Sequence, residues 1–395
     1  MGLNDTPAAE RVHIGIFGRR NAGKSSLINA ITGQSLAIVS DVKGTTTDPV
    51  QKAMELLPLG PVMLIDTAGL DDDTDLGALR VGKTRQVLNK TDIALLVVDA
   101  TEGMAGEDEA IRRRMEEKGI PYLVAMNKAD LLEQVPEREG DTLWVSARTG
   151  LNIWELKEAI ARKAPEEQSG KRLIGDLLQP GDMAVLVVPI DKAAPKGRLI
   201  LPQQQTIRDA LEAGASAVVC RDTELGETLE SLGKPPALVV TDSQAFAKVA
   251  KIVPESIPLT SFSMLFARYK GDLAEAIRGA EMLKKLRDGD RVLIAEGCTH
   301  HRQCDDIGTV KLPRWIRQFT GVEPEFCFTS GTEFPEDLSG YQLIVHCGGC
   351  TLNPREMRYR AACAKDQRVP MTNYGVLIAY MNGILPRCAA PLKAR

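Results

Sequence analysis

The stretch HIGIFGRRNAGKSSLINA, residues 13–30, joins a short apolar run to a glycine-rich segment and then to a helical pattern. Residues 18–25 read G-x-x-x-x-G-K-S, which is typical of a phosphate-binding loop between a β-strand and an α-helix. In such a loop backbone amides curl around phosphate, Lys24 reaches the β- and γ-phosphate oxygens, and the Ser25 hydroxyl coordinates Mg²⁺. A chance glycine turn with a lysine is the alternative, but the strand–loop–helix context argues against it. The residues expected to surround the phosphates are Gly18, Asn21, Ala22, Gly23, Lys24, Ser25 and Ser26.

Three further segments follow in the order that a guanine-nucleotide site requires. The run VMLIDTAGL (62–70) is a strand that ends in D-x-x-G, so Asp66 is expected to hold Mg²⁺ through water and the Gly69 amide to sense the γ-phosphate. YLVAMNKAD (122–130) is a buried strand that ends in N-K-x-D. There Asp130 can accept from the two donors on the guanine edge, while Asn127 and Lys128 tie the loop together. In TLWVSAR (142–148), the backbone at Ser146 and Ala147 is expected to meet guanine O6. Because adenine offers no such pair of donors, the base is guanine.

Residues 8–165 resemble the translation-factor-like GTPases, of the Era and TrmE type. The resemblance implies Mg²⁺-dependent GTP hydrolysis, with Lys24, Asn21, Thr46 and Gly69 in the catalytic set. Thr46 lies in GTTTDPV (44–50) and aligns with the Mg²⁺-coordinating threonine of the first switch, although Thr45 and Thr47 flank it.

Leu70 stands where Ras-like proteins carry the glutamine that orients the attacking water, and leucine cannot do this. In GTPases that resemble this one, an asparagine at the position of Asn21 often binds K⁺, which then lies against the phosphates. The alternative is that Asn21 caps its own loop. Both alternatives remain open from the sequence.

The bulk composition excludes several classes of protein. The chain has 395 residues, of which 44% are hydrophobic and 26% charged, and its net charge is −4. This balance is ordinary for a soluble globular protein and gives no general attraction to a nucleic-acid backbone. No apolar run approaches the length of a membrane span, and the amino-terminal residues do not read as a secretory signal. We therefore expect a cytoplasmic protein with no nucleic-acid or membrane partner, whose eight cysteines are thiols or ligands.

The rest of the chain alternates strand and helix patterns. A polar stretch at 163–172 marks a linker, after which apolar runs such as MAVLVVPI (183–190) and ALVVTD (237–242) are separated by helical segments. Such alternation predicts parallel sheets with right-handed crossovers. We expect three consecutive α/β domains with mainly parallel sheets: 8–168, a P-loop GTPase domain; 175–265, an α/β dimerisation domain; and 270–395, a metal-binding domain. The middle domain has no clustered titratable residues, so its apolar faces are either core or a homodimer interface.

Cysteine and histidine gather at two places in the third domain. EGCTHHRQC (296–304) follows the strand pattern DRVLIAEG (290–297), and HCGGC (346–350) ends the strand pattern that starts at 341. Because the carboxyl ends of parallel strands lie along one edge of a sheet, the two groups are expected to meet. The candidate metal ligands are Cys298, His300, His346, Cys347 and Cys350.

The pattern C-x-H…H-C-x-x-C leaves the metal open. It suits a closed zinc site, Cys₃His or Cys₂His₂, and it also suits a 4Fe–4S cluster held by three cysteines. In the second case the fourth iron is left to a weaker ligand such as His300, His346, Glu296 or Asp305, or to Cys304 as a fourth thiolate. Buried thiols without metal are the third alternative, which the position of these residues at strand ends disfavours.

A translation-factor-like GTPase domain, an α/β middle domain and C-x-H…H-C-x-x-C at the back together resemble the FeFe-hydrogenase maturation GTPases, the HydF family. The resemblance covers essentially the whole chain. It implies a scaffold whose 270–395 domain binds a 4Fe–4S cluster, and which accepts a 2Fe precursor made by two radical maturases and delivers it to apo-FeFe-hydrogenase. The alternatives are a zinc-stabilised regulatory GTPase and a GTPase of tRNA modification or ribosome assembly.

Overall fold

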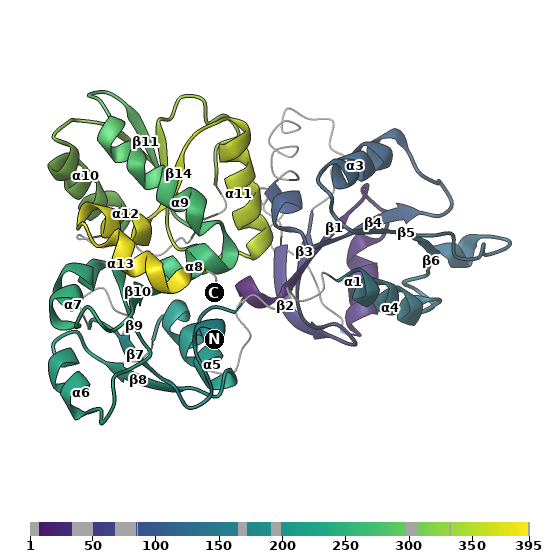
Figure 1. Ribbon diagram of the computed structural model, residues 1–395. Helices are drawn as coiled ribbons and strands as arrows, with labels where there is room; N and C mark the ends of the chain where they lie inside the picture. The colour runs from purple at the N-terminus through teal and green to yellow at the C-terminus, as the bar shows by residue number, and fades with distance from the viewer. Residues whose placement is uncertain are drawn as a thin grey trace. The chain divides into compact units, whose positions relative to one another are not determined.

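The computed structural model describes residues 8–33, 50–67, 84, 86–164, 172–190, 199–297, 306–331 and 333–393. The chain divides into two compact units, residues 1–169 and 170–395 (Figure 1). The first contains one sheet and the second contains two. This confirms the expectation of three α/β sheets that are mainly parallel.

The first unit is built on a six-stranded sheet in the order β2-β3-β1-β4-β5-β6. Only β2 runs antiparallel to its neighbour, β3. Central strand β4 is buried along its whole length, as expected of a strand covered on both faces. The strands are β1 (Val12–Phe17), β2 (Val50–Leu56), β3 (Gly60–Asp66), β4 (Ile93–Asp99), β5 (Tyr122–Asn127) and β6 (Thr142–Trp144).

Helices cover both faces of this sheet. Helices α1 (Lys24–Thr32) and α4 (Ile153–Lys163) pack on one face, and α3 (Gly106–Glu117) on the other (Figure 1). Each face has its own apolar core, because alternate residues of the parallel strands point to opposite sides. The loops after β1, β3, β5 and β6 therefore lie at the carboxyl edge of the sheet, where the predicted nucleotide residues are.

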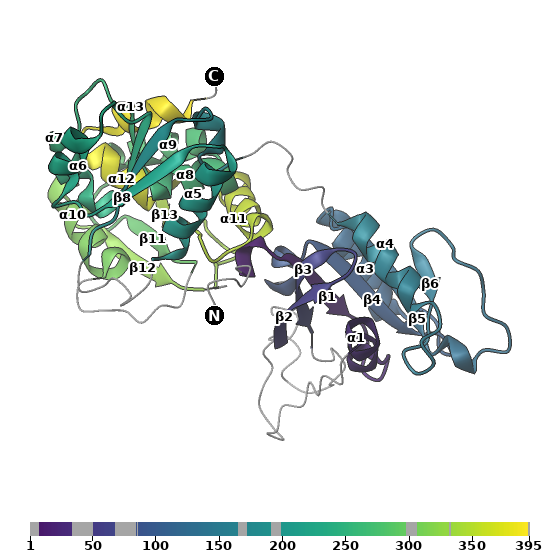
Figure 2. The same ribbon diagram turned by 90° about the horizontal axis from the view of Figure 1, so that it is seen from below.

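The second sheet is wholly parallel, in the order β10-β9-β7-β8. Its strands are β7 (Met183–Val187), β8 (Ser216–Cys220), β9 (Leu238–Thr241) and β10 (Leu259–Ser261). The helices that connect and follow them are α5 (Leu201–Glu212), α6 (Leu225–Ser231), α7 (Phe246–Ile252) and α8 (Phe262–Lys270). Helix α5 lies beside the edge strand β8 (Figure 2).

The third sheet is also parallel, in the order β12-β11-β13-β14. Its strands are β11 (Arg291–Ala295), β12 (Glu325–Thr329), β13 (Leu343–His346) and β14 (Met371–Asn373). Its helices are α9 (Leu273–Ala280), α10 (Leu312–Thr320), α11 (Pro354–Asp366), α12 (Tyr374–Met381) and α13 (Leu385–Ala389). Helices α8 and α12 lie between this sheet and the second one (Figure 1), and a single apolar core runs through both.

Residues 263–286 have a continuous helical pattern in the sequence, but they do not form one helix. Helix α8 ends at Lys270, α9 begins after Asp272, and the segment Glu281–Lys285 is a 3₁₀ turn. The break has a local cause, because the Asp272 side chain caps α9 by accepting from the amides of Ala274 and Glu275. Lys270 is thereby placed at the carboxyl end of a helix rather than in the middle of one.

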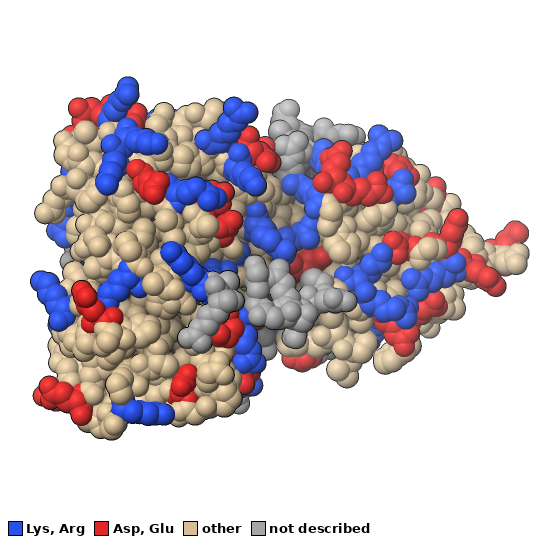
Figure 3. Space-filling view, viewed as in Figure 1, with Lys and Arg blue, Asp and Glu red and all other residues tan. Residues whose placement is uncertain are grey.

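Over the described residues, no helix is long and apolar enough to cross a membrane. On the face that Figure 3 shows, basic and acidic side chains are interspersed over the first unit rather than gathered by sign. Such a surface offers no continuous basic stripe on this face.

Candidate functional site

The backbone of the phosphate-binding loop requires glycine at two of its positions. Gly18 has φ +136°, and a Cβ there would lie 2.1 Å from the carbonyl oxygen of Val97 in β4. Gly23 has φ +88°, and its Cβ would lie 2.3 Å from Nδ2 of Asn127. Asn21 also has positive φ, 63°, a region that asparagine tolerates better than most residues. The loop is therefore fitted closely against β4 and against the loop after β5.

Lys24 begins helix α1 and is buried. Its ammonium donates to the carbonyl oxygens of Gly18 at 2.6 Å and Arg19 at 2.7 Å, so it closes the loop on itself. The next two residues, Ser25 and Ser26, are exposed. A bound phosphate would compete with these two carbonyls for the ammonium, which is the role expected of this lysine.

Asp66 ends β3 beside β1, in register with Ile16. Its carboxylate is buried, and its Oδ1 has no hydrogen-bond partner among the described residues. Burial raises the pKa of Asp66, and the positive charge of Lys24 opposes that rise. A buried carboxylate oxygen without a donor is costly unless a cation or its water satisfies it, so the site fits the predicted Mg²⁺.

The Asn127 side chain joins three loops of the predicted guanine site. Its Nδ2 donates to the carbonyl of Ala22 at 2.9 Å, and its Oδ1 accepts from the amide of Ala147 at 3.1 Å. The neighbouring Lys128 is in the left-handed region, with φ 66°, and its ammonium pairs with Asp99 at the end of β4. The residues that the sequence assigned to phosphate and to guanine thus form one connected network.

Asp130, the proposed guanine acceptor, is held by two neighbours. Its Oδ1 accepts from the Ser146 hydroxyl at 2.6 Å, and its Oδ2 lies 2.9 Å from the guanidinium of Arg148. Ser146 in turn accepts from the amide of Thr149. The ion pair with Arg148 has no counterpart in the sequence reasoning, although the residue lies directly after Ser146 and Ala147. Thr46 and Gly69 lie outside the described residues, as does Leu70.

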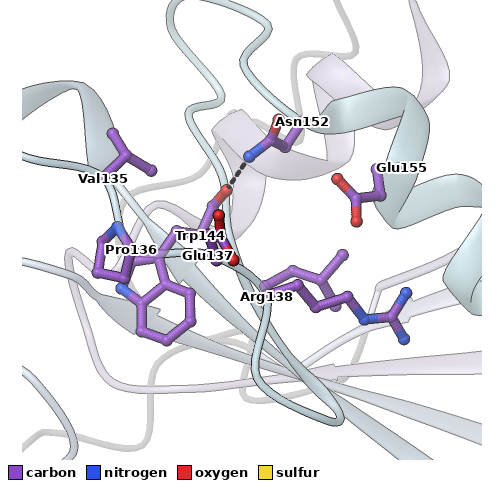
Figure 4. Close-up of a pocket in the computed structure, with 8 residues that line it drawn as sticks. Val135, Pro136, Glu137, Arg138, Trp144, Asn152 and Glu155 are labelled. Atoms are coloured by element: carbon purple, nitrogen blue, oxygen red, sulfur yellow. Dashed lines mark hydrogen bonds between the residues drawn. The ribbon is translucent and has the colours of Figure 1, made fainter.

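A cavity of about 300 Å³ opens in the first unit away from this network. It lies between segment 135–138, the end of β6 and the start of α4 (Figure 4), where Asn152 donates to the carbonyl of Trp144 at 2.8 Å. None of the predicted phosphate or guanine residues lines it. The cavity is therefore distinct from the nucleotide site.

The second site lies at the carboxyl edge of the third sheet. Strands β11 and β13 are direct neighbours, with Ala295 in register with His346, and the Cys347 amide donates to the carbonyl of Ala295 at 2.9 Å. The strands that precede the two cysteine- and histidine-rich segments therefore end side by side. Cys298, His300 and Cys304 lie outside the described residues. Among the described residues, no group of three or more metal-binding side chains occurs.

The sulfur of Cys347 in the C-G-G-C turn (residues 347–350) lies among backbone hydrogen-bond donors. The Cys347 sulfur accepts from the amides of Gly297 at 3.0 Å and Gly349 at 3.4 Å. Amide donors of this kind are what tune thiolate-bound iron–sulfur clusters. The Thr351 hydroxyl also donates to the carbonyl of Gly297 at 2.7 Å, so the residue that precedes Cys298 is tied to the turn from both sides.

Glycine is required within this turn. Gly349 has φ +61°, and a Cβ there would lie 2.5 Å from the sulfur of Met357 in α11. Burial raises the pKa of Cys347 to about 11 and also raises that of Cys350. A buried thiol of this kind becomes a thiolate when a metal replaces its proton, and the donor set fits that exchange.

His346 sits under the turn with both ring nitrogens engaged. Arg360 donates from Nη1 to Nε2 at 3.0 Å, and because a guanidinium can only donate, Nδ1 carries the proton and donates to the Cys347 carbonyl at 2.8 Å. Burial, followed by the nearby Arg360, lowers the pKa of His346 to about 3. To ligate metal through Nε2, His346 would have to release Arg360.

Family comparison divides the chain in the same way as the sheets. Residues 13–128 match the family model described as a 50S ribosome-binding GTPase. Residues 173–271 match the hydrogen maturase F dimerization domain, and residues 274–391 match the hydrogen maturase F tetramerization domain. The first unit is thus a P-loop GTPase domain, and both sheets of the second unit match domains named for self-association.

Curated relatives match mainly the first unit. A tRNA modification GTPase MnmE from Nitrosospira multiformis is 37% identical over 158 residues, covering 38% of this chain and 34% of the relative. An MnmE from a Synechococcus species is 30% identical over 233 residues, covering 59% of this chain and 48% of the relative. The chain thus spans from about a third to a half of the length of these relatives. Among solved structures, Era from Aquifex aeolicus bound to GDP and aluminium fluoride aligns with 21% identity and a TM-score of 0.35 over 56% of this chain and 98% of that chain.

Proposed function

The chain belongs to the hydrogen maturase F (HydF) family, and from that premise we propose that it is a GTP-hydrolysing scaffold for FeFe-hydrogenase maturation. In this role Cys298, Cys347 and Cys350 hold a 4Fe–4S cluster. The protein accepts a 2Fe precursor from the two radical maturases and delivers it to apo-FeFe-hydrogenase. The observation that carries the proposal is the C-G-G-C turn at the end of β13, whose Cys347 sulfur already receives two amide donors within a hydrogen maturase F domain.

The nucleotide site supports Mg²⁺-dependent hydrolysis of GTP. Lys24 and the loop amides would hold the phosphates, Ser25, Thr46 and Asp66 would serve Mg²⁺, and the Asn127–Asp130 loop would select guanine. Hydrolysis is expected to be slow, since Leu70 cannot orient water. We propose that K⁺ bound through Asn21 supplies charge to the transition state, so the turnover in KCl should exceed that in NaCl of equal ionic strength.

A bound cluster with three cysteine ligands leaves one iron with an exchangeable ligand, which suits docking of a second metal unit. The domain matches also support a homodimer as the working assembly. A zinc-stabilised regulatory GTPase is the competing function, because the same ligands suit zinc. A GTPase of tRNA modification is disfavoured, because the MnmE likeness leaves most of each relative's length unmatched.

The deciding experiment is anaerobic purification and reconstitution with iron and sulfide, followed by absorption and paramagnetic spectra, metal analysis and activation of apo-hydrogenase. Wild type should be brown and should activate apo-hydrogenase when loaded with a 2Fe precursor. Cys350→Ser should lose both properties, whereas Cys304→Ser and Cys327→Ser, the latter in strand β12, should keep both. Colourless protein with stoichiometric zinc would instead establish the regulatory GTPase.

A further inference from the structure

Lys270 is a buried cation directly beneath the C-G-G-C turn. It is the last residue of α8 and only 4% exposed. Its ammonium donates to the carbonyl oxygens of Gly349 at 3.1 Å, Cys350 at 3.1 Å and Leu352 at 2.8 Å. The three donors of one ammonium thus meet three acceptors within residues 349–352, two in the C-G-G-C turn and one just after it.

The Lys270 ammonium also contacts an aromatic ring of its own helix. The Nζ of Lys270 lies 5.3 Å from the centre of the Phe266 ring, one helical turn earlier in α8. Helix α8 is itself held to the third sheet, because Ser263 accepts through Oγ from the amide of Gly375 at 3.2 Å, and its carbonyl accepts from Asn373 at 2.9 Å. Lys270 is therefore presented to the turn by a helix whose amino-terminal end is anchored to residues 373–375.

Burying a positive charge here costs free energy that a purely structural hydrogen-bond donor would not need. Moving an ammonium out of water costs several kcal/mol, and a neutral donor could bond the same carbonyls without that cost. The charge is useful if the turn carries negative charge, as it does when its cysteines are thiolates around an iron–sulfur cluster.

We propose that Lys270 is a positioning residue for the cluster: it shapes the C-G-G-C turn through three carbonyls and, through its charge, stabilises the reduced, more negative form of the bound cluster. This inference rests on the proposed function for its second half only. The first half concerns the turn itself and holds with or without iron.

Three variants of Lys270 test its turn-shaping role and its charge role separately. Lys270→Met removes the donors and the charge, Lys270→Gln keeps amide donors and removes the charge, and Lys270→Arg keeps both. Lys285→Met is the matched control, because it removes one lysine charge from an exposed position in the same unit. Each variant is taken as the full chain, and its melting temperature is recorded first.

In the iron-free protein, the readout is hydrogen exchange at the Leu352 amide, which donates to the Gly349 carbonyl at 3.1 Å. Lys270→Met should exchange about tenfold faster than wild type there, as expected when a hydrogen-bonded turn loses its donor. Lys285→Met should exchange like wild type. An unchanged rate in Lys270→Met would overturn the turn-shaping role.

In the reconstituted protein, the readout is the midpoint potential of the cluster, which falls when positive charge is removed from its surroundings. Lys270→Gln should move the potential to more negative values, Lys270→Arg should restore it, and Lys285→Met should leave it unchanged. A wild-type potential in Lys270→Gln would overturn the charge role. If wild type takes up no iron, the proposed function fails instead, and the exchange experiment still decides the turn. If Lys270→Met does not fold, Lys270→Gln is compared with wild type in both experiments.

Discussion

Gly23 allows the phosphate-binding loop to lie directly against Asn127 of the predicted guanine loop. Any Cβ at this position would meet Nδ2 of Asn127 at 2.3 Å, and Asn127 in turn bonds Ala22 and Ala147. A side chain here would push apart the two halves of the site. The residue therefore serves both the backbone conformation of the loop and the close approach of its neighbour.

Gly23→Ala should weaken GTP binding by more than about tenfold, because it displaces Asn127 in addition to straining φ. Gly33→Ala is the control: Gly33 also has positive φ, 65°, but no described residue has an atom within 4 Å of its Cβ position. Both changes should lower the stability of the first unit by about 1–2 kcal/mol. Calorimetric titration with GTP measures the difference, and equal affinities in the two variants would contradict the coupling.

The sequence predicted the GTPase domain itself, because each of its motifs carries its chemistry within a few positions, and the individual nucleotide residues stay predictions. It did not reach the contacts of His346. The partner of its Nε2, Arg360, is fourteen residues away on a helix whose sequence reads as an ordinary amphipathic one. Lys270 was hidden for the same reason, since only the fold brings α8 under a turn 80 residues later in the chain.

Arg360 attaches helix α11 to the third sheet, and Glu356 of the same helix pairs with its buried charge. Arg360 is fully buried, and it donates to Glu356 at 2.8 Å, to His346 at 3.0 Å and to the carbonyl of Gly331 at 2.8 Å. The helix thereby fixes the end of β13 and the loop after β12 in one arrangement. The cysteine turn between β13 and α11 is held in place at both of its ends.

Arg360→Met should destabilise the second unit by about 3–5 kcal/mol, because it leaves the buried Glu356 carboxylate without its partner. The double variant Arg360→Met/Glu356→Leu should recover most of this loss, since removing both charges leaves neither uncompensated. Arg358→Ala, at an exposed position of the same helix, should stay within about 0.5 kcal/mol of wild type. Urea denaturation measures the stability of all three variants. If Arg360→Met is as stable as Arg358→Ala, the buried pair does not have this role.

The sequence predicted the positions of several strands, but it did not predict which strands pair with each other. Apolar runs located β7, β9 and β11, whereas the three-residue strands β10 and β14 are too short to produce a period. The break between α8 and α9 could be seen only as Gly271–Asp272 inside a continuous helical pattern, where the capping hydrogen bonds of Asp272 outweigh helix propensity. Pairing across a sheet depends on residues far apart in the chain, which local periodicity does not encode.

At the scale of the molecule, the second and third sheets share one apolar core. Its buried members run from Leu173 to Leu392 and include residues of both sheets and of α8 and α12. The sequence-based boundary between residues 265 and 270 falls inside α8. The proposed dimerisation and cluster domains are therefore expected to behave as one folding unit.

Scanning calorimetry of the full chain should show two unfolding transitions, one for each compact unit, because residues 170–395 cannot lose one sheet without exposing the core of the other. Mg²⁺ and GDP at about 100 times the dissociation constant should stabilise the first unit by about 2.7 kcal/mol. For a unit of this size the shift is about 5–10 °C, and it should appear in one transition only, because the nucleotide residues all lie in the first unit. A transition that belongs to the GTPase domain is thus identified by the ligand rather than by its temperature. Three transitions would contradict the shared core of the second unit. A nucleotide shift in both transitions would contradict the independence of the two units.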